Sequence, residues 1–248
     1  MRKLLLTLLL LVSASAIAAT SRVAIVIDDI GYRYTDHQVL EIPGDITYAV
    51  LPHTPYGKKL ANIAHKNNHD VFLHIPMEAE HLTNLGPGAL TSDMDEKAIR
   101  ESLNKSFSEI PFAIGINNHM GSRLTKMYDP MVWTMSYLKD NQKLFLDSKT
   151  SAGSKASQAA RDVGVPTRNR HVFLDNELTE AYIVNQFIEL VNNAQRNEIA
   201  IAIAHPHPET VRVLKKMIPT LASHNVELVP LSELYPNKQQ NTALLNAL

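Results

Sequence analysis

The sequence of 248 residues contains no cysteine. This absence excludes disulfide bonds, thiolate nucleophiles and cysteine-ligated metal sites, so any metal site must use histidine and carboxylate side chains. The chain also lacks a strong charge of either sign, with a formal net charge of −1. A balance this close to neutral gives no electrostatic case for binding nucleic acid. Tryptophan is nearly absent as well, and Trp133 is the single tryptophan of the sequence.

Long apolar runs are missing except at the start of the chain. Arg2 and Lys3 precede an apolar run over residues 4–12, and small residues follow, with Ala-Ile-Ala at 16–18. This order is typical of a secretory signal peptide, and the run is too short for a stable membrane span. We expect cleavage after residue 18 or 19 and a periplasmic or secreted protein. An uncleaved anchor is the alternative, which the small residues disfavour.

Short apolar runs and amphipathic segments alternate through the rest of the chain. We expect strands at 23–27, 46–50, 71–73, 113–116, 144–146, 171–174, 199–204 and 227–229. Helical patterns lie between most of them, at 56–66, 95–107, 130–139, 154–162, 179–195 and 208–223. About eight such alternations predict an α/β fold, a (β/α) barrel that is closed or slightly irregular.

No internal repeat or low-complexity linker divides the chain. We therefore expect a signal peptide over 1–19, a single barrel domain over 20–235 and a loosely held tail over 236–248, rich in Gln and Asn. A long insertion over residues 78–93 follows the third strand and could cover the barrel mouth.

The first strand ends in two adjacent carboxylates, Asp28 and Asp29, followed by Gly31. Ionised carboxylates beside a dry core are costly unless they are paired or bound to a metal. One such Asp is typical of a helix N-cap, but the pair favours a functional site. Strand alternation predicts that the two side chains point in different directions, so that one can bind an ion while the other moves a proton.

Polar residues also follow nearly all of the remaining strands. They are His53, His74, Asn117-Asn118-His119, Asp147-Ser148-Lys149, Asp175-Asn176 and His205-Pro206-His207. In a barrel these strand ends meet at one rim, so residues distant in sequence converge there. Helix capping is an alternative for Asp147 and the favoured interpretation for Asp175. A packing or surface position is favoured for His53, His65, His69, His171 and His224.

One carboxylate and two imidazoles form the ligand set of a catalytic zinc, with a fourth position left for water. Asp29, His74 and His119 are the candidate ligands of a divalent metal, for which zinc is the favoured ion. Glu78 lies close to His74 in the chain and could reach the same rim.

Five motifs, in this order, resemble the divergent polysaccharide deacetylases, the YibQ-like group. They are Val-Ile-Asp-Asp-Ile-Gly, Leu-His-Ile-Pro-Met-Glu, Gly-Ile-Asn-Asn-His-Met-Gly-Ser, Phe-Leu-Asp-Ser and Ala-His-Pro-His. That family is related to the NodB-type carbohydrate deacetylases, which have a (β/α) barrel and a divalent metal. The resemblance implies that Asp28 is the general base, Asp29 and His74 bind the metal, and His205 is the general acid.

The motifs also depart from the NodB pattern. NodB-type enzymes have a second metal histidine four residues after the first, where this chain has Glu78. The second imidazole must come from elsewhere, with His119 favoured, unless Glu78 replaces it. The arginine motif has no clear counterpart, although Arg123 could substitute for it. We add His207 and Asp147 to the catalytic candidates, and Glu78, Asn118 and Arg123 to those for substrate binding.

These features predict an exported metal-dependent hydrolase that removes N- or O-acetyl groups from an acylated glycan. A non-catalytic protein that binds glycan and metal on the same barrel is the main alternative. Another metallohydrolase, such as an amidase or phosphoesterase, is the third. The aromatic content of 6% counts mildly against an extended sugar-stacking cleft. The sequence leaves the glycan and the oligomeric state open.

Overall fold

The structure is a computed structural model that describes residues 20–81 and 83–236. Its strands are β1 (Ser21–Ile30), β2 (Thr47–Val50), β3 (Val71–Met77), β4 (Gly115–Met120), β5 (Leu144–Asp147), β6 (Thr167–Asn169), β7 (Val172–Phe173), β8 (Ile199–Ala204) and β9 (Val226–Leu228). The α-helices are α1 (Gly57–Lys66), α2 (Glu96–Glu109), α3 (Tyr128–Asp140), α4 (Ala156–Val163), α5 (Glu180–Asn197) and α6 (Pro208–Met217). Four 3-10 segments complete the fold: η1 (Tyr34–Glu41), η2 (Leu124–Lys126), η3 (Ile218–His224) and η4 (Leu231–Leu234).

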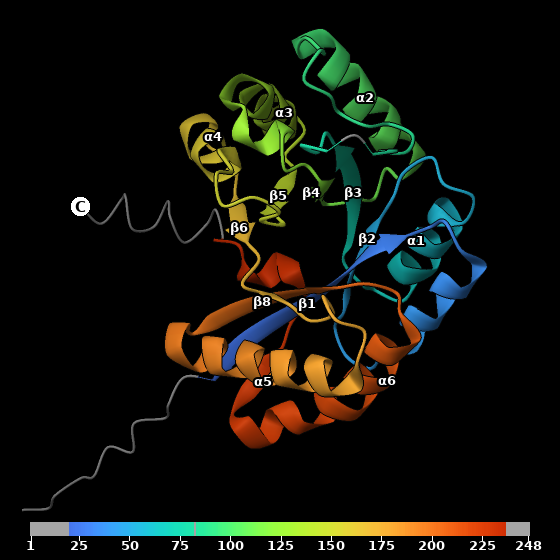
Figure 1. Ribbon diagram of the computed structural model, residues 1–248, viewed down its shortest axis with the longest axis vertical. Helices are drawn as coiled ribbons and strands as arrows, with labels where there is room; N and C mark the ends of the chain where they lie inside the picture. Colours follow the sequence, from blue (N-terminus) through green and yellow to red (C-terminus); the bar gives the residue numbers. More distant parts are fainter. Residues whose placement is uncertain (1–19, 82, 237–248) are drawn as a thin grey trace, which may run out of the picture.

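The sheet is parallel throughout and curls into an open barrel. Its order is β6-β5-β4-β3-β2-β1-β8-β7, and β9 pairs with the start of β1. Only Arg170 and His171 separate β6 from β7 in the chain, so the two ends of the curled sheet lie close together. The helices surround the sheet on its outer side (Figure 1). The predicted (β/α) barrel is confirmed in its irregular form, and the open seam falls between β6 and β7.

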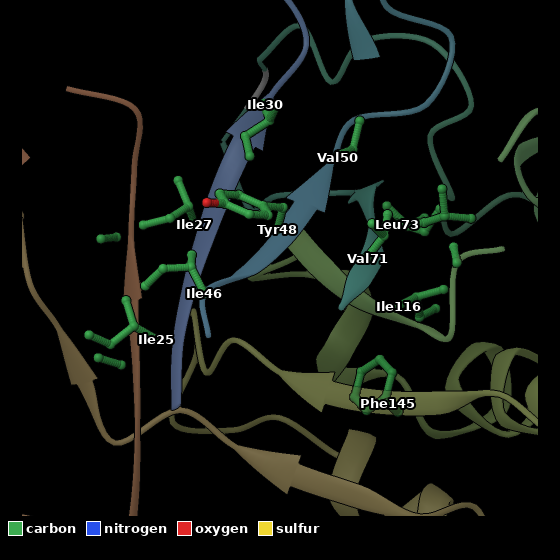
Figure 2. Close-up of a cluster of buried hydrophobic side chains, with 14 of the residues drawn as sticks. Ile25, Ile27, Ile30, Ile46, Tyr48, Val50, Val71, Leu73, Ile116 and Phe145 are labelled. Carbon is green, nitrogen blue, oxygen red and sulfur yellow. The ribbon is translucent and has the colours of Figure 1, made fainter. Parts of the chain in front are cut away.

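Side-chain alternation along the strands divides the core into two layers. Val23, Ile25 and Ile27 of β1 belong to the layer that packs under the helices, part of which Figure 2 shows. Ala24 and Val26 belong to a second layer inside the curl, whose buried members include no α-helical residue and which η4 closes at the N-terminal end. Its buried members are Ala24, Val26, Ala49, Phe72, Leu146, Ile201, Ile203, Val229, Leu231, Leu234 and Tyr235.

A polar layer follows the inner apolar layer towards the C-terminal ends of the strands. Side chains alternate between the two faces of a strand, so the inner face also carries those of Asp28, His74, Asn117 and His205. His74 and Asn117 are direct neighbours in the β3–β4 register. The inner face therefore changes from apolar to ionisable where the strands reach the C-terminal rim.

Several strands extend further than the sequence predicts, and in β3 and β4 the extension brings histidines of the site into the sheet. The predicted strand at 71–73 continues to Met77, and the one predicted at 113–116 runs from Gly115 to Met120. Pro76 is tolerated inside β3 because pairing with β2 ends at Leu73, so no partner there needs its missing N–H. His74 and His119 thus lie within strands, held by ladder hydrogen bonds, rather than in loops.

The prediction of one helix over 208–223 is wrong in its second half. The α-helix α6 ends at Met217 and continues as the 3-10 segment η3, because Pro219 cannot extend an α-helical hydrogen-bond ladder. The strand predicted at 171–174 corresponds to β7, and β6 was not predicted.

Several expectations concern parts of the chain outside the described residues. The signal peptide at 1–19 and the tail at 236–248, apart from Pro236, remain predictions, as does the division into one domain between them. Among the helices of the described residues, none combines the length and the apolarity that crossing a membrane requires.

Candidate metal centre

The two carboxylates of β1 are separated by a change of backbone conformation. Asp28 is 2% exposed and points inward, as its parity requires. Asp29 has a φ of +58°, and the β1–β2 register shifts between Ile27 and Ile30. This left-handed residue in a bulge turns the Asp29 side chain from the helix-facing side towards the rim.

The two side chains consequently converge on one imidazole. Asp28 Oδ2 lies 3.6 Å from His74 Nδ1, and Asp29 Oδ1 lies 3.1 Å from His74 Nε2. They approach opposite nitrogens of the ring, and the bulge, rather than simple strand alternation, sets the direction of Asp29.

Three side chains bring potential ligand atoms to one point. Asp29 Oδ1 is 2.8 Å from His119 Nδ1, and His119 Nδ1 is 3.2 Å from His74 Nε2. One potential ligand atom from each of Asp29, His74 and His119 lies within 4.8 Å of the other two. The structure thus brings together the three residues that the sequence predicts as ligands.

The chemistry of this donor set fits a divalent ion. Asp29 Oδ1 is buried, yet it accepts no well-oriented hydrogen bond from the described residues. Ligand atoms that share one zinc at about 2.0–2.2 Å stand roughly 3–3.5 Å apart, close to the separations seen here. An oxygen without a hydrogen bond beside two imidazole nitrogens is the arrangement that a cation satisfies.

Asn117 fixes the orientation of both His74 and Asp28. Its amide nitrogen donates to Asp28 Oδ1 and Oδ2 at 2.8 and 3.0 Å, which leaves its oxygen to accept from His74 Nδ1 at 2.8 Å. A proton on Nδ1 leaves the lone pair of Nε2 free, facing Asp29 and His119. Hydrogen-bond partners of this kind orient metal-binding histidines and tune their basicity.

Burial and neighbouring charge act differently on the two carboxylates. Burial raises the pKa of Asp28, and the His74 and His205 charges reduce that rise. For Asp29, burial also acts to raise the pKa, but the close His119 and His74 nitrogens outweigh it and hold the pKa well below its ordinary value. Asp29 thus stays ionised as a ligand must, while Asp28 gains affinity for a proton.

His205 forms a second charged pair at the rim. Its Nδ1 lies 2.8 Å from Asp175 Oδ1, and its backbone N–H donates to Asp175 Oδ2 at 2.7 Å. Burial lowers the pKa of His205, but its hydrogen bond to Asp175 and the charges of Asp175, Asp29 and Asp28 raise it to about 9. His207 is partly buried at the N-cap of α6, with its ring 6.2 Å from that of His205.

Asp147 lies on the other side of the sheet. Its parity places it on the helix-facing side of β5, where Oδ1 accepts from the Lys149 N–H at 2.8 Å and Oδ2 from Ser154 Oγ at 2.7 Å. These bonds shape the turn before α4. We therefore assign Asp147 to that turn and correct the expectation of a catalytic role.

The predicted substrate-binding residues make contacts outside the cluster of ligand atoms. Glu78 is paired with Arg123 at 3.1 Å and accepts from the Ser92 N–H at 2.6 Å, which ties the ends of the loop over residues 78–93. Glu78 is not among the clustered donor atoms. Asn118 has outward parity and supports the strand ends, because its Oδ1 accepts from the Ser148 N–H at 2.9 Å.

Three residues near the site were missed or given another role by sequence reasoning. Asn117 was overlooked beside Asn118, although strand parity distinguishes the two. Asp175 was assigned to helix capping, but it pairs with His205. Arg170 lies at the seam, donates to the Ser148 and Lys149 carbonyls at 2.7 and 3.0 Å, and is close enough to Asp28 for their charges to interact. Arg170, rather than the exposed Arg123, is the arginine near Asp28.

The fold and the site together define a parallel (β/α) barrel with a candidate Asp-His-His metal centre at its C-terminal rim. The model of the divergent polysaccharide deacetylases matches residues 25–235, so the chain belongs to that family. It is 38% identical over 234 residues to the uncharacterized protein YibQ of Escherichia coli K12, covering 94% of this chain and 73% of YibQ.

Solved structures place the chain in the same fold group. An uncharacterized protein of Agrobacterium tumefaciens has a TM-score of 0.84 at 27% identity, over 88% of this chain and 90% of that one. The catalytic domain of a peptidoglycan N-acetylglucosamine deacetylase from Eubacterium rectale has a TM-score of 0.55 at 16% identity, over 85% and 88%. A CE4 family pseudoenzyme from Bacillus anthracis has a TM-score of 0.55 at 15% identity, over 87% and 65%. The last two show likeness of fold alone.

Proposed function

We propose that this protein is an exported, metal-dependent hydrolase that removes acetyl groups from a polysaccharide. One observation carries the proposal: the buried carboxylate of Asp28 and the three candidate ligands are joined through His74 and Asn117 into one cluster. Membership of the divergent polysaccharide deacetylase family supports the glycan as substrate. The proposal of export rests on the sequence of residues 1–19.

Asp29, His74 and His119 would bind the ion, with zinc the favoured one for an O,N,N ligand set. A bound divalent ion supplies a water of lowered pKa and polarises the carbonyl of the acetyl group. Asp28 and His74 are buried, which limits the access of bulk water to this side of the cluster and strengthens its electrostatic interactions.

The residues of the chain would perform the proton transfers. Asp28 would accept a proton from the attacking water, and its raised pKa favours that acceptance. Asn117 would hold the Asp28 carboxylate in position throughout. His205, kept protonated by Asp175, would give a proton to the sugar nitrogen as the carbon–nitrogen bond breaks. The products are acetate and a free amine.

Two substitutions at adjacent positions separate the base from the ligand. Asp28→Asn keeps the shape of the side chain but removes the base, so acetate release should fall about a hundredfold or more while metal content stays nearly unchanged. Asp29→Asn should reduce the metal content itself. The measurement is acetate release from acetylated chito-oligosaccharides and peptidoglycan fragments, together with metal analysis of each purified variant.

Asp162→Asn is the matched control, because Asp162 is an exposed carboxylate of α4 that bonds Tyr128 away from the cluster. It should leave both readouts unchanged. A wild-type protein that binds these glycans and metal but releases no acetate would favour the non-catalytic binding protein instead. Full activity in Asp28→Asn would contradict the assignment of the base.

A further inference from the structure

Two exposed aromatic side chains follow directly after the metal-site strand. Tyr32 is 48% exposed and Tyr34 64% exposed, although most large apolar side chains of the described residues are covered. Exposed aromatic faces next to a candidate site mark recognition surfaces, because a ligand can cover them. Two of the few aromatic side chains of this protein therefore follow shortly after Asp29 in the chain.

The backbone on both sides of Tyr32 is held rigidly. The carboxylate of Asp36, which is fully buried, accepts hydrogen bonds from the N–H groups of Gly31 and Arg33, each at 3.0 Å. The Tyr56 N–H in turn donates to the Gly31 carbonyl at 2.9 Å. The backbone that carries Tyr32 is thus preorganised, which reduces the entropy lost when a ligand binds there.

The Tyr32 side chain extends towards the loop that follows β3. A Cβ atom on Gly86, whose φ is +85°, would stand only 2.4 Å from the Tyr32 hydroxyl oxygen, so the two are in close contact. Since β1 carries Asp29 and β3 carries His74, the ring bridges the segments that follow two ligand-bearing strands. Tyr34 instead packs against His37 and Tyr56, with ring centroids 5.0 and 5.9 Å away.

We propose that Tyr32, backed by Gly86, is a stacking platform for the sugar ring next to the residue that is deacetylated. The apolar face of a pyranose would lie on the phenol ring, while its hydroxyl groups remain in water. This inference rests on the proposed function and names its substrate class more closely. On this proposal an oligomer is preferred over a single acetylated sugar, because a second sugar ring is needed to cover Tyr32 while the first lies at the metal centre.

The dependence of activity on chain length tests this assignment. Zinc-loaded full-length protein is assayed for acetate release from N-acetylglucosamine and from its tetramer. Tyr32→Ala should lower kcat/KM for the tetramer by about 3- to 10-fold, the scale of one aromatic stacking contact, and leave the monosaccharide unaffected. Tyr32→Phe keeps the ring and should behave as wild type. Tyr128→Ala, at an exposed tyrosine bonded to Asp162, should change neither substrate.

Equal losses on both substrates, or no loss on the tetramer, would overturn the platform while leaving the deacetylase proposal intact. A wild-type protein that releases no acetate would instead remove the proposed function. Isothermal titration calorimetry then measures how tightly the same variants bind the tetramer, and Tyr32→Ala should bind it about 3- to 10-fold more weakly than wild type. Equal affinities, or no binding by wild type, would overturn the platform as well.

Discussion

At the residue scale, the pair of His205 and Asp175 controls a proton. The Asp175 side chain is fully buried, accepts from Thr210 Oγ1 at 2.7 Å and is oriented by it towards the imidazole. A buried carboxylate held in this way stabilises the imidazolium over the neutral ring. His205 is therefore charged at neutral pH, whereas an ordinary histidine with a pKa of about 6.5 is mostly neutral there.

This pair predicts a pH dependence of defined sign. If His205 is the proton donor, kcat/KM should fall as pH rises through about 9, the pKa of its imidazole. In Asp175→Asn the fall should move towards about 6.5, because the main stabilising charge is gone. Profiles of kcat/KM against pH for both proteins check this. A fall at the same pH in both would exclude His205 as its source.

The same pKa has a consequence for stability. Because the folded-state pKa of about 9 lies above the ordinary value, protonated His205 stabilises the fold. That contribution is complete below about pH 6.5 and disappears as pH rises through about 9.

The ligand residues of this site can be predicted from the sequence, but the directions in which side chains point are harder to predict. Asp29, His74 and His119 could be chosen from the sequence because a rim collects residues from strand ends. Asn117 and Asn118 are chemically identical, so only the register of β4 tells which one faces inward. The mistaken catalytic role of Asp147 has the same origin, since one position of shift reverses the side of the sheet.

At the scale of single elements, the end of β1 combines a ligand with backbone strain. Asp29 adopts a φ of +58°, a conformation that costs a residue with a Cβ atom about 1–2 kcal/mol. The strain places its carboxylate between two imidazoles instead of under the helices. A sequence pattern does not reveal such a conformation, because Asp is acceptable both in a strand end and in a bulge.

Substitution of Asp29 by two small residues measures that strain. Neither glycine nor alanine can bind a metal, but glycine adopts a positive φ without a steric penalty. In the presence of a chelator, Asp29→Gly should be more stable than Asp29→Ala by about 1 kcal/mol. Urea unfolding monitored by circular dichroism gives the difference. Equal stabilities would mean that the backbone relaxes at this position.

At the scale of the whole molecule, the metal centre joins strands from separate parts of the chain. Asp29, His74 and His119 come from β1, β3 and β4, and β2 lies between the first two in the sheet. An ion bound by all three must be released on unfolding, so binding should stabilise the whole sheet.

Metal removal should therefore lower the unfolding temperature. At a free zinc concentration of about one hundred times Kd, binding adds about 2.7 kcal/mol to the free energy of unfolding. For a chain of this size that corresponds to a rise in Tm of about 5–10 °C over chelator-treated protein. Calorimetry of wild type and Asp29→Gly checks this, and the variant should show little change. An equal rise in both would indicate that zinc binds other histidines.

The architecture as a whole was accessible from the alternation of apolar runs and amphipathic segments. The seam was not, because β6 and β7 are too short to give a pattern, and they pair with different neighbours, β5 and β8. Arg170, which lies between them in the chain, stacks on Phe173 at 3.7 Å and bonds carbonyls beyond β5. Side-chain contacts thus replace backbone pairing at this point, and such contacts have no sequence periodicity.

The position of the seam also bears on aggregation. The strand order from β6 to β7 begins and ends with its shortest strands, Thr167–Asn169 and Val172–Phe173. A two-residue link joins these two strands in the chain. A long exposed edge strand is a template on which another chain can add β-structure. Here each free edge is short and turned towards the other. The fold therefore offers little edge for a foreign strand, which suits a chain that contains no disulfide to hold it closed.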